Sequence, residues 1–164
     1  MSLEQWQDKQ WQDNGKEVVG VTAGERFQDL VLDQLLVLRD AGSIRVELVS
    51  EEEDYYYGTD VIVDGVRWDV TLDHKKGNVH WGTGVQTDIS NIAVGLRKGN
   101  CHHDFDEPVM VVQFEPAAQL PAQYNRQWMK LAAEEINPAL IEDISSRYWN
   151  LVDELEERGV VQSY

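Results

Sequence analysis

Residues 55–73 read YYYGTDVIVDGVRWDVTLD, and this stretch decides the fold. Asp64 and Gly65 lie between two runs rich in β-branched and aromatic residues. An Asp-Gly pair in that setting is the strongest short-range signal for a β-hairpin, and it predicts a two-residue type I′ turn. The sequence therefore predicts two antiparallel strands joined at this pair.

The register set by this turn gives the hairpin two different faces. The first face is nearly all apolar and pairs Val63 with Val66, Val61 with Trp68, Thr59 with Val70 and Tyr57 with Leu72. The other face places Asp60 opposite Asp69, so it gathers carboxylates and is expected to point away from the interior. A slip of one residue would bury these acids, and the register is therefore well specified.

Helices and further strands are predicted on both sides of the hairpin. A capping box of Thr22 and Glu25 opens a helix that ends before Gly42. Alternation of apolar residues predicts a half-buried strand at Ile44–Val49. The remaining predicted elements are a short helix at Thr87–Lys98, a buried strand at Pro108–Phe114, a helix at Ala122–Ile136 and a final helix from Asn137-Pro138 to about Glu157.

The length and the order of elements favour a single α/β domain, of the α+β type, over residues 1–164. We expect an N-terminal extension at 1–20, a core at 22–115 and a C-terminal helical extension at 120–158. The final helix carries an apolar seam formed by Ile141, Ile144, Tyr148, Leu151 and Leu155. Core packing is the expected use of this seam, and a homodimer through it is the alternative.

The net charge of −16 is unevenly spread: residues 1–59 and 101–164 each carry −8, and residues 60–100 are neutral. An acidic surface repels phosphate backbones, so this charge disfavours nucleic acid as a partner. A substrate of that kind would bind through the neutral centre with the help of a divalent metal. No apolar run reaches the roughly 20 residues of a membrane helix, and the single cysteine, Cys101, fits a reducing compartment. We therefore expect a cytoplasmic protein without a membrane partner.

Two short motifs in this element order point to a family. Gly58 to Asp60 read G-x-D, and Asp69 to Lys75 read D-x-T-x-D-x-K. With the order helix, three strands, helix and strand, residues 22–115 resemble the PD-(D/E)XK nuclease superfamily, whose core is restriction-endonuclease-like. The resemblance implies an αβββαβ core with a central mixed sheet flanked by helices. It also implies carboxylates that bind Mg²⁺, a lysine that assists the attacking water, and hydrolysis of phosphodiester bonds in nucleic acid.

Asp60 and Asp69 are the expected metal ligands. Directly opposed strand residues lie about 4.5–5.5 Å apart at Cβ, and Mg²⁺ prefers oxygen ligands. Asp73 and Lys75 are the other candidate catalytic residues. However, six strand residues place Lys75 about 20 Å from Asp69, so the catalytic lysine is displaced or missing. Glu25 is a further candidate ligand, although its capping role explains it without a function.

Cys101, His102 and His103, followed by Asp104 and Asp106, form a second candidate metal cluster, which His80 would extend. Zinc sites usually draw their ligands from separated segments, which disfavours a single loop. The expected function is a metal-dependent nuclease, active or degenerate. The alternative is a non-catalytic acidic binding or accessory protein of phage or mobile-element origin. A protein that mimics nucleic acid through its acidity is a third interpretation.

Overall fold

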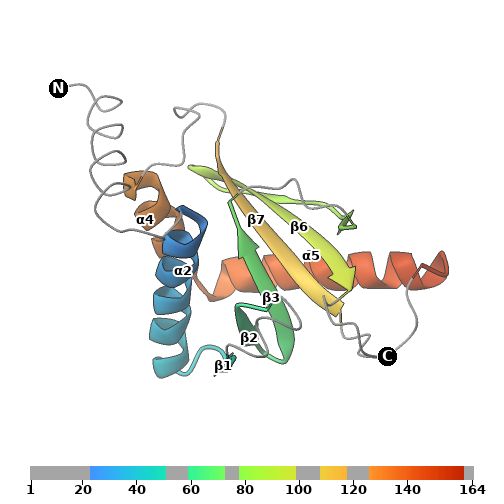
Figure 1. The fold of residues 1–164 in the computed structure, drawn as a ribbon, viewed down its shortest axis with the longest axis horizontal. Helices are drawn as coiled ribbons and strands as arrows, with labels where there is room; N and C mark the ends of the chain where they lie inside the picture. The colour runs from blue at the N-terminus through green and yellow to red at the C-terminus, as the bar shows by residue number, and fades with distance from the viewer. Residues whose placement is uncertain (1–22, 51–58, 73–77, 99–107, 118–125, 161–164) are drawn as a thin grey trace.

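A computed structural model describes residues 23–50, 59–72, 78–98, 108–117 and 126–160 of the chain. Within these residues a mixed sheet of seven strands packs against three helices (Figure 1). The helices are α2 (Ala23–Asp40), α4 (Arg126–Glu134) and α5 (Pro138–Glu157). The strands are β1 (Val46–Leu48), β2 (Val61–Val63), β3 (Val66–Thr71), β4 (His80–Trp81), β5 (Val85–Gln86), β6 (Ser90–Lys98) and β7 (Pro108–Pro116). The predicted α+β class is thereby confirmed.

The sheet has the order β1-β2-β3-β7-β6-β4, and β5 pairs with β6 beside this path. Strands β3 and β7 run parallel, and the other neighbouring pairs are antiparallel. In Figure 1, β7 lies between β3 and β6 in the middle of the sheet. The chain thus builds β1 to β3 on one side and β4 to β6 on the other, and closes the sheet with β7.

The predicted hairpin forms between β2 and β3. Asp64 has φ +49° and Gly65 has φ +83°, and two positive values are what a type I′ turn requires. The register pairs Val61 with Trp68 and Val63 with Val66. The predicted pairing is therefore confirmed from the turn as far as Val61.

Helix α2 confirms the predicted first helix and shows how it ends. Ser43 N–H donates to the Leu38 carbonyl at 3.0 Å, and Gly42 N–H donates to the Arg39 carbonyl at 2.9 Å. These two bonds form a Schellman motif, which needs a left-handed residue where Gly42 has φ +79°. The glycine thus stops the helix and turns the chain toward β1.

Helix α5 begins at the predicted cap. The Asn137 side chain accepts from Leu140 N–H at 2.8 Å, and Pro138 occupies the first helical turn. The apolar seam of this helix is buried inside the chain as part of one hydrophobic cluster. Core packing therefore accounts for the seam without a second copy.

Two local predictions were wrong. Thr87–Lys98 is not a helix, because Ser90–Lys98 forms β6, the partner of β7 along its whole length. Ile92, Val94 and Leu96 alternate onto the core side, and this period of two outweighs the helical spacing that the same segment contains. Leu48 was expected on the buried side of a half-buried strand, but it is the last residue of β1 and is 60% exposed.

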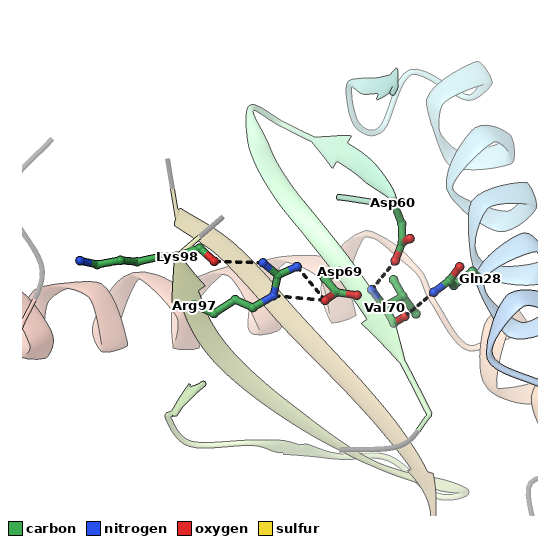
Figure 2. Close-up of polar contacts among 6 residues, drawn as sticks. All are labelled: Gln28, Asp60, Asp69, Val70, Arg97 and Lys98. Atoms are coloured by element: carbon green, nitrogen blue, oxygen red, sulfur yellow. Dashed lines mark hydrogen bonds and ion pairs between the residues drawn. The ribbon is translucent and has the colours of Figure 1, made fainter. Parts of the chain in front are cut away.

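The two faces of the sheet have different contents. The buried apolar residues of all three helices share one cluster with the first face of the sheet, which includes Trp68, Val94 and Val112. The second face contains the buried Val109 and Val111, which lie outside that cluster. Asp69 and Arg97, which are also buried, lie on this second face as well (Figure 2). None of the helices in the described part of the chain combines the length and apolarity needed to span a bilayer.

Candidate functional site

The predicted hairpin register changes at Asp60. Asp60 N–H donates to the Trp68 carbonyl at 2.8 Å, although Trp68 is already the partner of Val61. Two residues of one strand therefore face one residue of the other, which is the arrangement of a β-bulge. Asp60 consequently does not sit directly opposite Asp69, as the regular ladder predicted.

The Asp60 carboxylate accepts a hydrogen bond from the backbone of the neighbouring strand, β3. Its Oδ2 accepts from Val70 N–H at 2.8 Å, at a point where β2 no longer pairs with β3. A buried backbone N–H left without an acceptor is costly. The carboxylate thus replaces a ladder bond that the bulge removes.

Helix α2 satisfies the other polar group of the same residue. Gln28 Nε2 donates to the Val70 carbonyl at 3.1 Å, as Figure 2 shows. Because a carbonyl only accepts, the amide must turn its NH₂ toward Val70 and its Oε1 away. Val70 is therefore held from two sides, by Asp60 and by Gln28.

Asp69 lies on the second face of the sheet and is paired with Arg97. Its Oδ2 accepts from Arg97 Nη2 at 3.0 Å and from Arg97 Nε at 3.3 Å. Both side chains are buried, with 5% of Asp69 and 7% of Arg97 exposed. The prediction that the acidic face is open to solvent was therefore wrong for Asp69.

This ion pair spans the central strand. Asp69 pairs with Val111 and Arg97 pairs with Val109, so the bridge crosses β7 diagonally. Strands two places apart are separated by about 9–10 Å, a gap that a long arginine side chain closes. Removal of one side chain would leave the other charge buried without its ion-pair partner, so each charge depends on the other.

The structure places the two predicted ligands in different local roles. Figure 2 shows the Asp69 carboxylate turned toward Arg97 and the Asp60 carboxylate turned toward Val70. A Mg²⁺ ion held by both would have to share Asp69 with the guanidinium. Asp69 in this arrangement therefore does not fit a magnesium ligand, and no step through a metal follows from it.

The other predicted site residues are only partly described. Asp73 and Lys75 lie outside the described residues, as do Cys101, His102, His103, Asp104 and Asp106. Glu25 is exposed in the first turn of α2, where an acid favours the helix dipole. His80 is exposed on β4. Among the described residues, His, Cys, Asp and Glu side chains form no group of three or more that could hold a metal ion.

A pocket of about 200 Å³ opens between α2 and the β2–β3 hairpin. Its polar lining consists of Gln28, Asp29, Ser50 and Asp60. Its apolar lining consists of Val31, Leu32, Val49, Val61 and Val70. We call it the α2 pocket. Of the predicted site residues, it contains Asp60.

A second pocket of about 210 Å³ lies beside the hairpin turn. Tyr148, Trp149 and Val152 of α5 line it together with Val66 and Pro108. Trp149 is 52% exposed, and its ring meets that of Tyr148 edge-on at 5.2 Å. This pocket is more apolar than the α2 pocket, and no predicted site residue is among the described residues that line it.

Sequence reasoning missed three residues of this region: Gln28, Asp29 and Arg97. Arg97 was assigned to a helix, where a basic residue needs no explanation. As a strand residue it lies on the side opposite Val94 and Leu96, in a strand with neighbours on both sides. An arginine is almost never fully buried unless it is paired, so its position in such a strand indicates a partner of opposite charge.

Comparison with known proteins adds no relative to this picture. No protein-family model matches the chain, and neither a curated protein nor a solved structure matches it.

Proposed function

We propose that this chain is a non-catalytic acidic binding protein. The observation that carries the proposal is the buried pair of Asp69 and Arg97. Phosphodiester cleavage of the kind that the sequence resembles needs carboxylates left available to a cation. Here a guanidinium donates two hydrogen bonds to one of the two expected ligands, and the other supports the backbone of Val70.

Charge indicates the kind of partner. A net charge of −16 attracts basic surfaces and speeds their encounter, while it repels nucleic acid. The proposed partner is therefore a protein with a basic surface. Its association with the chain is expected to weaken as salt concentration rises.

The test is a cleavage assay together with a metal titration. Wild type is incubated with single- and double-stranded DNA and with RNA, in Mg²⁺ or Mn²⁺, and its melting temperature is measured in the same buffers. We expect no cleavage and no metal-dependent rise in melting temperature. Metal-dependent cleavage by wild type that Asp60→Asn abolishes would overturn the proposal.

A Mg²⁺-dependent nuclease of the PD-(D/E)XK type is the second candidate function. The favouring observation is that two acidic residues, Asp60 and Asp29, line one pocket. In this reading Asp60, with Asp73, Lys75 and Glu25, forms the catalytic set, and Asp69 stays paired with Arg97. Cleavage in the assay above that is lost in Asp60→Asn and Asp73→Asn, but retained in Asp33→Asn, would favour it.

A further inference from the structure

We infer that the α2 pocket takes one lysine side chain of a protein partner. The inference rests on the proposed binding function and deepens it by naming the site and the chemistry recognised there. It is carried by the size of the pocket, the division of its lining into apolar and acceptor parts, and the hydrogen bonds that orient two of its polar groups.

The size of the pocket limits what it holds. Pockets for drug-sized ligands measure roughly 300–1,000 Å³, and the α2 pocket measures about 200 Å³. A nucleotide or a large cofactor therefore does not fit. A single long side chain, or an amine of similar size, does fit.

The apolar part of the lining suits an aliphatic stem. Val31 and Leu32 come from α2, Val61 and Val70 come from the hairpin, and Val49 follows β1. Val31, Val61 and Val70 belong to the main hydrophobic cluster, so this wall is fixed by the core. A lysine buries its methylene chain on such a surface and keeps its charged end at the polar rim.

The polar part of the lining is rich in acceptors. The Gln28 amide donates through Nε2 to Val70, which leaves Oε1 as its acceptor end (Figure 2). Asp60 is fixed by the Val70 N–H bond, and Asp29 adds a second carboxylate. Three residues whose side chains carry acceptor oxygens therefore line one small space, and an ammonium group has three donors and no acceptor.

The same lining residues disfavour a ligand that carries a carboxylate. Two acidic residues line the wall and repel an anion, and none of the described residues that line the pocket is basic. Arginine is the nearest competitor, but its planar guanidinium prefers a two-pronged contact with a single carboxylate. The mixed amide and carboxylate rim favours the compact ammonium.

The experiment uses lysine itself as the probe. Nα-acetyl-lysine methylamide is titrated into ¹⁵N-labelled wild type, and the amide shifts of Leu32, Val61 and Val70 are followed. A single side-chain contact predicts a dissociation constant on the order of 1 mM. The side-chain-acetylated probe, which lacks the charge, is expected to bind at least about tenfold more weakly.

The matched variants are Asp29→Asn and Asp33→Asn. Both remove one charge from an exposed position on α2, but only Asp29 lines the pocket. Asp29→Asn is expected to weaken binding of the lysine probe by about fivefold or more, and Asp33→Asn is expected to leave it within twofold. If both variants lose the same affinity for the lysine probe, the effect comes from the overall negative charge of the protein. That outcome would overturn the assignment.

The remaining outcomes separate this inference from the proposed function. Absence of any shift in wild type, equal shifts with the acetylated probe, or tighter binding of the matching arginine probe would each overturn the lysine assignment and leave the binding function standing. Metal-dependent cleavage by wild type would overturn the binding function, whatever the lysine titration gives.

Discussion

Arg97 holds Asp69 across the central strand of the sheet, with Nη2 at 3.0 Å and Nε at 3.3 Å from the same carboxylate oxygen. Both side chains are almost fully buried. The pair joins β6 to β3, two strands that do not touch each other in the sheet order. Asp69, which was predicted to bind a metal, is therefore a structural residue that links two strands of the sheet.

Loss of Arg97 should destabilise the fold strongly. Arg97→Met leaves the Asp69 carboxylate buried without its guanidinium, and removal of one partner of a buried pair costs about 3–5 kcal/mol. Urea denaturation measures this free energy of unfolding. Arg147→Met is the control, because its pair with Asp143 lies near the surface and is expected to contribute less than about 1 kcal/mol.

Replacing both Asp69 and Arg97 tests whether the loss of stability in Arg97→Met comes from the buried Asp69 charge that remains. The double variant Asp69→Leu with Arg97→Met removes both charges, and we expect it to recover most of the stability lost in Arg97→Met alone. If the double variant is as unstable as the sum of the two single variants, the two side chains do not act as a pair.

Asp60 should act on stability through its acceptor oxygen. Asp60→Ala leaves Val70 N–H without its acceptor, and we expect a loss of about 1–3 kcal/mol in the free energy of unfolding. Asp60→Asn keeps an acceptor oxygen in the same place and should lose less than half as much. Equal losses in the two variants would show that the Val70 bond is not what Asp60 contributes.

Gly95 should not accept a side chain. A Cβ placed there would lie 2.6 Å from Val79 Cγ1 and 2.8 Å from Trp81 Cε3, so Gly95→Ala must displace Trp81 or strain β6. We expect a loss of about 1–3 kcal/mol, as for other overpacked sites, and a changed tryptophan fluorescence spectrum. Gly82→Ala is the matched control. Its nearest neighbours are Leu151 side-chain atoms at 3.2 Å or more, which can adjust, so its loss should be smaller.

The cap of α5 offers a small and well-defined test. Asn137→Ala removes the acceptor of Leu140 N–H, and loss of an N-cap typically costs about 1 kcal/mol. Asn150→Ala, at an exposed position inside the same helix, is the control and should be neutral or slightly stabilising because alanine favours helices. The free energies of unfolding of both variants are measured by urea denaturation. If they differ by less than about 0.3 kcal/mol, the capping role is contradicted.

Local chemistry accounts for the parts of the fold that the sequence predicts well. The Asp64-Gly65 turn, the Gly42 stop and the Asn137-Pro138 start each depend on a backbone preference of one or two residues, so a short window contains the whole signal. The local signal at the start of β6 is ambiguous, because Thr87 Oγ1 accepts from Ser90 N–H at 2.9 Å, the same bond that a threonine makes at the start of a helix. The residues of β6 match both a helical and a strand period, and the choice depends on β7, which lies farther along the chain.

The candidate site was predictable only in part for a related reason. The acidic residues of the hairpin and their alternation are visible in the sequence. Whether a carboxylate stays available depends on what meets it in space, and Arg97 is 28 residues away from Asp69. The bulge at Asp60 likewise appears only when the hydrogen bonds of Trp68 are traced. Asp60 and Asp69 were predicted to share one metal ion. In the structure Asp60 accepts from Val70 N–H, and Asp69 pairs with Arg97.

The strand order also bears on how the molecule matures. The middle strand, β7, is made after both of its neighbours, β3 and β6, so a ribosome-bound chain that stops short of it carries two separate sheet fragments with open edges. Such edges attract other strands, and closing long loops slows folding. Residues 108–116 are therefore the segment whose synthesis allows the two halves to join into one sheet.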